Sequence, residues 1–463
     1  MVDERTSVGS SAQKVSASTI SWWQSIIEYG HPRVVGMLFL GFSAGLPFLL
    51  VFSTLSAWLR DIGISRTTIG FFGWIGITYS IKFLWSPLVD RLRIPFLTRM
   101  LGKRRSWMLA GQIGIAIGLF TMTLVDPKSD LALFAFVAFL VAFSSATQDV
   151  ALDAYRIEAV DSRYQGPMAS NYQTGYRVGV LMAGAGALFI ADVANFQVAY
   201  ASMALLMLVG IITVLVLDEP DTDLQVAKSR EKDLLAAISE LVPSSYLLND
   251  FQKWILGAIV CPFLDFFRRV GWWALAILAF VAVYRIGDLV MGIMANPFYL
   301  DLGFTKSEIA AISKLFGFTM TVTGAIAGGL AVARYSAVRM LIVGAILVAV
   351  TNLLFAELAA LGADRSFLVV TISADNFSAG FAGSVFIAFL SSLTSTTYTA
   401  TQYALFSSLM TLPGKIISGY SGIIVDTYDY QWFFYYAAAM GIPAIVMSVV
   451  MMLWSSRSDQ QNG

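Results

Sequence analysis

The sequence predicts an all-α membrane protein with 12 transmembrane helices in two six-helix bundles. Three observations predict this fold: the composition, the lengths of the apolar runs and the distribution of basic residues along the chain. Of the 463 residues, 57% are hydrophobic and 13% are charged. A soluble domain carries about 45–50% apolar and about 25% charged residues, so the composition excludes a soluble protein.

Apolar runs give the order of the helices. A helix needs about 20 apolar residues to cross the hydrocarbon core of a bilayer. Runs of about that length predict spans at 34–58, 68–89, 106–125, 131–152, 168–191, 198–217, 271–297, 308–332, 338–360, 367–390, 400–424 and 432–454. A polar stretch after the sixth run divides the chain into a tail (1–33), a six-helix bundle (34–217), a linker (218–270), a second six-helix bundle (271–454) and a tail (455–463).

The linker leaves an alternative of 14 spans open. Residues 254–264 are apolar but lie between Lys253 and Asp265. A run this short suits an amphipathic helix in the membrane interface better than a crossing. The polar, Ser-rich residues 1–30 have no apolar signal-peptide segment, so we expect no cleavage.

The basic residues predict the orientation. Of 30 Lys and Arg residues, five lie within apolar runs and five lie in the connections on one side, namely Arg60, Arg66, Lys128, Lys306 and Arg365. The remaining 20 lie on the other side. By the positive-inside rule, that second side is cytoplasmic and so are both termini and the linker.

An internal repeat supports two related halves. Residues 63–69 (GISRTTI) precede the second span, and residues 303–309 (GFTKSEI) precede the eighth. Gly, a hydroxyl, a basic residue, a hydroxyl and Ile recur in the same order, although helix-capping chemistry alone could produce part of the match. We favour duplication because both segments hold the same rank within their halves.

A charged motif follows the second span: residues 86–91 (SPLVDR) are followed by residues 102–105 (GKRR), and 328–330 (GGL) with Arg334 and Arg339 form a degenerate second copy. This motif resembles the signature of the major facilitator superfamily. The aspartate of such a motif can cap or pair with a neighbouring helix end and release it as the halves rock. An ordinary positive-inside loop is the alternative. The expected gating residues are Asp90, Arg91, Arg104 and Arg105.

Charged side chains inside the apolar runs predict a polar path. They are Lys82, Asp149, Arg177, Arg285, Asp288, Lys314, Asp375 and Lys415. Each would cost about 2.5–3.5 kcal/mol at the bilayer centre if it faced lipid, roughly 20 kcal/mol or more together. They must therefore face a polar interior, which disfavours a purely structural scaffold.

Carboxylates are the expected carriers of protons. The single His, His31, lies in the polar tail and the single Cys is Cys261, which excludes disulfide frameworks, Cys/His metal sites and a Ser-His-Asp triad in the membrane. The proton-coupling candidates are Asp149, Asp153, Asp288 and Asp375. Static ion pairs are the alternative for each of three: Asp149 with Arg177, Asp153 near Arg156, and Asp288 with Arg285.

Basic and amide side chains are the expected ligands of a polar substrate. The candidates are Lys82, Gln148, Gln173, Tyr176, Arg177, Arg285, Lys314, Asn376, Gln402 and Lys415. No nucleophile–base pair accompanies them, so an enzyme is not expected.

Six longer motifs are specific beyond the apolar helices: residues 41–47 (GFSAGLP), 57–63 (AWLRDIG), 82–91 (KFLWSPLVDR), 146–156 (ATQDVALDAYR), 284–288 (YRIGD) and 399–405 (TATQYAL). Together they resemble the AmpG muropeptide permeases. The resemblance implies a permease of the Gram-negative inner membrane that imports GlcNAc-1,6-anhydroMurNAc and its peptides by proton symport. It also implies a role in peptidoglycan recycling and β-lactamase induction, with Asp149 as the first candidate for proton coupling.

Other functions and partners complete the expectations. Transporters of acetyl-CoA share parts of these motifs, so another anionic substrate is an alternative, as is a non-transporting membrane assembly factor. The expected partners are the muropeptide, a proton and the lipid bilayer. We expect a monomer with no cofactor, no metal and no nucleic-acid partner.

Overall fold

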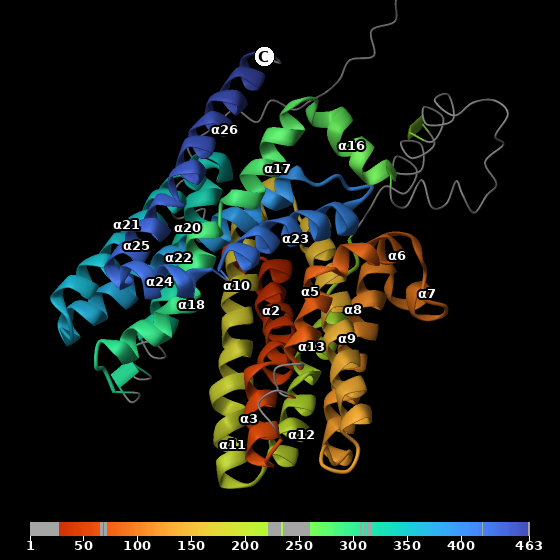
Figure 1. The fold of residues 1–463 in the computed structure, drawn as a ribbon. Helices are drawn as coiled ribbons and strands as arrows, with labels where there is room; N and C mark the ends of the chain where they lie inside the picture. The colour runs from red at the N-terminus through yellow and green to blue at the C-terminus, as the bar shows by residue number, and fades with distance from the viewer. Residues whose placement is uncertain are drawn as a thin grey trace, which may run out of the picture.

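The structure is a computed structural model that describes residues 27–64, 68, 72–220, 233–234, 260–305, 308–309, 312, 316–418 and 420–461. Within these residues the secondary structure is helical, without strands. Predicted features that lie partly or wholly outside the described residues include the N-terminal tail up to residue 26, most of the linker, parts of both copies of the internal repeat, and Lys314. Figure 1 shows the helices in two groups, called here the first bundle (helices within 32–216) and the second bundle (helices within 273–461).

Helices of the first bundle follow the predicted order. They are α2 (Pro32–Leu50), α3 (Ser53–Asp61), η2 (Gly73–Gly76), α5 (Ile77–Ser80), η3 (Lys82–Leu84), α6 (Ser86–Arg91), α7 (Leu97–Leu101), α8 (Lys103–Leu124), α9 (Leu131–Glu158), α10 (Gln165–Leu181), the π-helical turn η5 (Met182–Gly186), α11 (Ala187–Val193), α12 (Phe196–Leu206) and α13 (Leu208–Val216). Short 3₁₀ turns, η1 (Glu28–Gly30) and η4 (Ser162–Tyr164), precede α2 and α10.

The second bundle repeats this plan after a short linker helix. Helix α16 (Cys261–Val270) ends at Gly271 and leads into α17 (Trp273–Val283). The remaining helices are α18 (Ile286–Asp301), α20 (Gly317–Tyr335), α21 (Ala337–Leu361), α22 (Arg365–Leu393), α23 (Thr399–Ser418), α24 (Ser421–Tyr428), α25 (Tyr430–Ala439) and α26 (Ile442–Gln461).

Side-chain caps fix where several helices begin. The carboxylate of Asp130 accepts a hydrogen bond from the backbone N–H of Leu133 at the start of α9, and Asp364 does the same for Phe367 at the start of α22. Such caps satisfy N–H groups that have no partner within the helix. The predicted fourth span ended at residue 152, but α9 continues to Glu158. This extension places more of the helix between the bundles than the apolar run predicts.

Nine helical stretches in the described part of the chain are long and apolar enough to cross a membrane. The predicted spans 68–89, 308–332 and 400–424 are not among them. In the described part of 68–89 the helix is broken into η2, α5, η3 and α6. The all-α membrane fold is therefore confirmed, whereas the number of 12 spans stays a prediction.

The internal repeat has the same backbone geometry in both halves. Gly63 and Gly303 end α3 and α18 with φ values of 87° and 97°. The N–H of Ile64 bonds the carbonyl of Leu59 at 2.9 Å, and the N–H of Phe304 bonds that of Tyr299 at 3.1 Å. Both ends are therefore Schellman caps, which need a left-handed residue that glycine supplies without strain.

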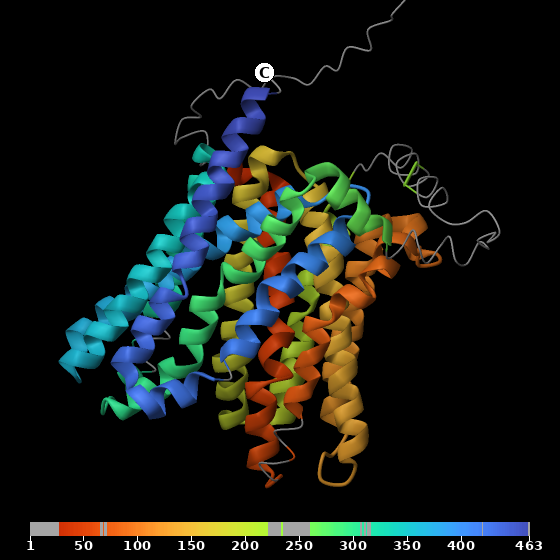
Figure 2. The same cartoon turned by 45° about the horizontal axis from the view of Figure 1, so that its top comes forward.

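The bundles meet along two sets of helices. In the first bundle α2 packs on α10, and in the second α20 packs on α22; α10 then contacts α20 and α22, while α23 contacts α6 and α9. We call the end at which Asp90, Glu158 and Thr399 lie the Asp90 end. Figures 1 and 2 show α11 and the outer ends of α18 and α21 diverging away from that end.

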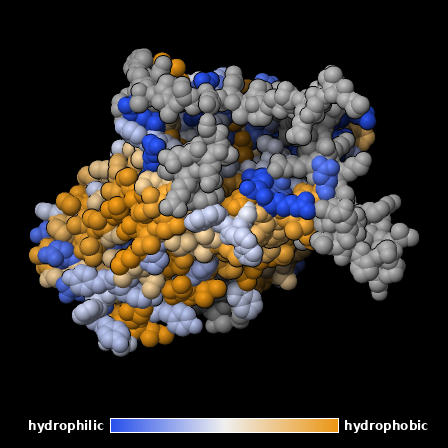
Figure 3. Space-filling model, turned by 90° about the horizontal axis from the view of Figure 1, so that it is seen from above, coloured by the Kyte–Doolittle hydropathy of each residue, from blue (hydrophilic) through white to orange (hydrophobic). Residues whose placement is uncertain are grey.

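Large apolar side chains cover much of the outside of both bundles. Examples on one helix, α8, are Ile117, Phe120 and Leu124, which are 62%, 53% and 72% exposed. Figure 3 shows broad apolar areas on the flank of the molecule. Such a surface is stable in contact with lipid, in agreement with the composition.

Candidate functional site

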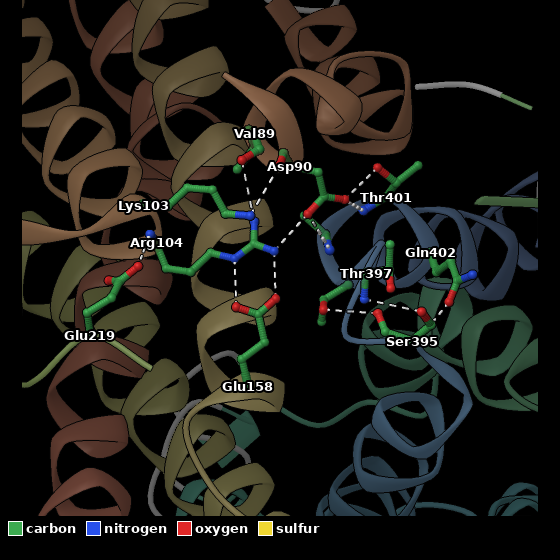
Figure 4. A network of polar contacts seen from close by, with 12 residues as sticks. Val89, Asp90, Lys103, Arg104, Glu158, Glu219, Ser395, Thr397, Thr401 and Gln402 are labelled. Atoms are coloured by element: carbon green, nitrogen blue, oxygen red, sulfur yellow. Dashed lines mark hydrogen bonds and ion pairs between the residues drawn. The ribbon is translucent and has the colours of Figure 1, made fainter. Parts of the chain in front are cut away.

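Asp90 joins the two bundles at the Asp90 end (Figure 4). Its carboxylate accepts hydrogen bonds from the backbone N–H groups of Ala400 and Thr401 at 3.2 and 2.8 Å, and from the Thr401 hydroxyl at 2.7 Å. These N–H groups belong to the first turn of α23, where they have no helical partner and the helix dipole is positive. The contact of Asp90 with a neighbouring helix end is therefore present, whereas its role in gating stays a prediction.

Basic side chains keep this carboxylate ionised. Arg104 donates to Asp90 at 2.8 Å, and Lys103 donates to the Asp90 backbone carbonyl at 3.1 Å. Burial opposes ionisation of Asp90, but Arg104, Lys103 and the Thr401 hydroxyl together lower its pKa below the usual value of 3.8. Asp90 is therefore a permanent anion near neutral pH.

Arg104 links Asp90 to α9 within the first bundle, and Arg105 contacts the end of α13. The Arg104 guanidinium binds both oxygens of Glu158 at 2.6 and 2.9 Å. Arg105 donates to the carbonyls of Val214 and Leu215 at the end of α13, where a cation offsets the negative end of the helix dipole. Arg91 is the last residue of α6.

A first charge cluster lies on α9 and η3. Lys82 and Asp153 form an ion pair at 3.5 Å, and Asp149 lies one helical turn away, within electrostatic reach of both. In the described part of the chain, Asp149 Oδ1 is buried without a hydrogen-bond partner. The alternative of a static ion pair between Asp149 and Arg177 is not found among the described residues, in which Lys82 is the cation within electrostatic reach of Asp149.

A second charge cluster lies where α10 faces the second bundle. The expected ion pair between Arg285 and Asp288 is present. Arg177 is exposed and has Arg285, Asp288 and Asp375 as its charged neighbours. Tyr176 lies within electrostatic reach of both Asp149 and Arg177, so it stands between the two clusters.

The predicted amide ligands take part in helix packing. Gln148 is fully buried and donates to Ser43 at 3.3 Å, and Asn376 accepts from Thr321 at 3.0 Å within the second bundle. Gln173 accepts from Ser384 at 3.1 Å across the bundles. Their role toward a substrate stays a prediction.

Two further predicted ligands contact other elements. Lys415 is exposed and donates to Ser80 of the first bundle at 2.9 Å. Gln402 donates to the Pro262 carbonyl at 2.8 Å and to Asp265 at 3.1 Å, and therefore holds α16 against the start of α23.

Sequence reasoning missed Arg156. It counted this residue among the loop charges because the apolar run ended at residue 152, whereas the structure buries Arg156 completely between the bundles. A signal was available: residues 149, 153 and 156 are spaced by four and three, so they share one face of a helix.

Comparison with known proteins identifies the family. The family model described as Major Facilitator Superfamily matches residues 37–296. The chain belongs to the major facilitator superfamily. Solved structures agree in fold: the proton:xylose symporter XylE superposes with a TM-score of 0.63 and FucP in its outward conformation with 0.64, each 13% identical and each covering 92% of this chain.

Relatives within this superfamily are transporters and permeases. The putative transporter AmpG 4 of Rickettsia conorii is 33% identical over 89% of this chain and 95% of that protein. The anhydromuropeptide permease of Escherichia coli K12 is 31% identical over 91% of this chain and 80% of that protein. The predicted AmpG resemblance is confirmed, and this major facilitator protein is a multi-pass membrane transporter and not an enzyme.

Proposed function

We propose that this protein imports anhydromuropeptides from the periplasm to the cytoplasm by proton-coupled alternating access. The observation that carries the substrate class is the 31% identity to the E. coli anhydromuropeptide permease over 91% of the chain. The two charge clusters inside the bundles supply groups for the proton and for a charged substrate. Recycling of the peptidoglycan is the use that this substrate class implies.

The second charge cluster suits the charges of a muropeptide. Arg177 is exposed where α10 faces the second bundle, and the Arg285–Asp288 pair is only half-buried. We assign the peptide carboxylates to Arg177, Arg285 and Lys415, and the amino group to Asp288 or Asp375. Charge-assisted hydrogen bonds of this kind are about twice as strong as neutral ones, so they select charged substrates.

The first charge cluster suits the proton. Asp149 Oδ1, which has no hydrogen-bond partner among the described residues, and the shared cation Lys82 give a carboxyl group whose proton affinity depends on its neighbours. Asp149 is therefore the first candidate for coupling, ahead of Asp153, which Lys82 and Arg156 hold as an ion pair.

The Asp90 end is assigned to the cytoplasm. The connections at this end contain Arg93, Arg99, Lys103, Arg163 and Arg334, whereas Lys128 and Arg365 lie in connections at the opposite end. By the positive-inside rule the basic end is cytoplasmic. With the Asp90 cap formed, the structure is closed toward the cytoplasm, and release of substrate requires that cap to break.

Uptake into proteoliposomes tests the proposal. Vesicles containing the purified protein should accumulate labelled GlcNAc-1,6-anhydroMurNAc peptide when the outside is acidic, and should lose accumulation when a protonophore collapses the gradient. Unlabelled acetyl-CoA should not compete with the label. Absence of accumulation in wild-type vesicles would favour a non-transporting protein, and competition by acetyl-CoA would favour the other anionic substrate.

A further inference from the structure

Arg156 connects the first charge cluster with the second bundle. Its Nη1 donates to the Ser391 hydroxyl near the end of α22 at 2.6 Å, and its guanidinium lies 5.0 Å from the centre of the Tyr403 ring on α23. The residue is 0% exposed. One cation of the first bundle therefore contacts two helices of the second bundle, α22 and α23.

The same guanidinium contacts the proposed proton site. Nη2 lies 3.5 Å from Asp153, whose other oxygen lies 3.5 Å from Lys82. The titratable and charged groups around Arg156 are Lys82 from η3, Asp149 and Asp153 from α9, Tyr172 from α10 and Tyr403 from α23.

The charge of Arg156 is only loosely satisfied. Both ion pairs of Asp153 are long, and within the described residues Arg156 Nε is buried without a hydrogen-bond partner. A guanidinium stays protonated at any physiological pH, so this buried cation must be balanced by neighbours or by water. When the bundles separate at this end, Ser391 and Tyr403 move away and Asp153 is left as the balancing group.

The balance between these partners depends on the proton site. Lys82 interacts with both Asp149 and Asp153. A proton on Asp149 removes the attraction between its carboxylate and Lys82. Lys82 then interacts more strongly with Asp153 and competes with Arg156 for it. Protonation therefore changes the free energy of separating the bundles, and separation changes the proton affinity by the same factor.

We propose that Arg156 is the positioning residue that couples proton binding at Asp149 and Asp153 to opening of the cytoplasmic end. The inference rests on the proposed proton-coupled transport. It assigns the coupling to a residue that binds neither the proton nor the substrate. A bridge that merely packs the bundles would not make opening depend on pH.

Two readouts test this role. In a Cys261→Ser background, an Ala169→Cys reporter on α10 measures separation, because Ala169 is buried against the second bundle and becomes open to a thiol reagent when the bundles part. At each pH the labelling rate is divided by the rate for the same protein in denaturant, because the reactive thiolate fraction rises with pH in any structure; this ratio is called reporter labelling. The reporter needs no substrate. The second readout is the ratio of gradient-driven uptake to exchange of labelled muropeptide, since exchange needs no net proton transfer.

Arg156→Gln should remove the coupling. Reporter labelling of the parent protein should change between about pH 5 and about pH 8, and Arg156→Gln should flatten this change by about tenfold, within the range of typical couplings. Gradient-driven uptake should fall by a similar factor while exchange persists. Ser391→Ala, which keeps the cation, should change both readouts in the same direction as Arg156→Gln does. Arg156→Lys should keep part of the pH dependence and part of the gradient-driven uptake that Arg156→Gln loses.

Arg163→Gln is the matched control. Arg163 lies exposed at the same end, and its replacement removes the same charge without touching the bundle interface. The inference is overturned if the parent labelling does not depend on pH, or if Arg156→Gln lowers uptake and exchange equally with an unchanged pH profile. Failure of wild-type vesicles to accumulate muropeptide would contradict the proposed function instead, because the labelling profile does not depend on substrate.

Discussion

The Asp90 carboxylate of the first bundle is hydrogen-bonded to both the backbone N–H and the hydroxyl of Thr401 in the second, at 2.8 and 2.7 Å. The bonds cross from the end of α6 to the first turn of α23, so they exist only while the bundles touch. Closure at this end therefore combines a charge on one bundle with a helix N-terminus on the other.

Asp90→Asn should favour opening of the cytoplasmic end. Hydrogen bonds to charged groups contribute about 1.5–3 kcal/mol, so loss of the charge should shift the closed-to-open equilibrium about tenfold to a hundredfold. Labelling of the Ala169→Cys reporter in the Cys261→Ser background should rise accordingly. Asp161→Asn is the control, since Asp161 is exposed at the same end; equal labelling of the two variants would refute the prediction.

The contribution of the Asp90 cap should not depend on pH near neutrality. The pKa of Asp90 is held below its usual value of 3.8 in the closed state. The stabilisation is therefore fully present above about pH 4 and is lost as the pH falls through the lowered pKa. In an Asp149→Asn, Asp153→Asn background, reporter labelling, taken as the ratio to the rate for denatured protein at the same pH, should stay constant between about pH 5 and about pH 8. A change of this ratio in that window would show that another group at the cap titrates.

Gly329→Val should block closure sterically. A Cβ at Gly329 would lie 2.4 Å from the Tyr29 hydroxyl, 2.6 Å from Ser170 Cβ and 2.9 Å from the Gly166 carbonyl, all on the first bundle or its N-terminal turn. We expect reporter labelling to rise and uptake to fall by at least about tenfold, because overpacking by one side chain costs about 1–3 kcal/mol. Gly422→Val is the matched control, as a Cβ there meets nothing within 4 Å. If Gly329→Val took up substrate at the wild-type rate, the close approach of Gly329 to the first bundle would be contradicted.

Asp149→Asn should abolish pH-gradient-driven uptake while the protein stays folded. The amide has nearly the shape of the carboxyl group but cannot bind and release a proton, and no ion pair of Asp149 is lost among the described residues. Uptake with and without a gradient and size-exclusion chromatography in detergent measure the two effects. Asp192→Asn, at an exposed position, should behave as wild type. Undiminished gradient-driven uptake by Asp149→Asn would remove Asp149 from the coupling role.

The sequence predicted the fold correctly at positions where a local pattern, such as a helix cap, determines the backbone. Asp130 and Asp364 cap α9 and α22 near the predicted starts of their spans, and Gly63 and Gly303 repeat one helix end in each half. The Asp90 cap was also predictable, because a helix end offers N–H groups that an aspartate can satisfy.

Charge partners that lie on different helices were not predictable from the sequence, whereas the pairs within one helix were. Which cation lies near Asp149 depends on how the broken helix over residues 72–91 packs against α9, and no local sequence pattern predicts that packing. Lys82, and not Arg177, is the cation within electrostatic reach of Asp149. Arg156 was missed for a related reason. A span predicted from hydropathy ends at the first charged residues, although a charged side chain that is buried between two bundles does not face lipid.

Gln402 was predicted to bind the substrate, but its contacts are those of a structural residue. Its amide donates to the Pro262 carbonyl and to Asp265, and accepts from Ser395 and Arg269 at 2.8 and 3.1 Å. Gln402→Leu would leave the buried Pro262 carbonyl and the buried Ser395 N–H without this partner, at about 1–3 kcal/mol each. We expect the melting temperature to fall by several degrees while the KM for muropeptide changes by less than about twofold. Tryptophan fluorescence on heating and initial uptake rates measure the two quantities. Gln431→Leu, at an amide with one long contact to Tyr435, should change neither. A raised KM at an unchanged melting temperature would show instead that Gln402 binds the substrate, because a group that only holds α16 on α23 contributes nothing to affinity.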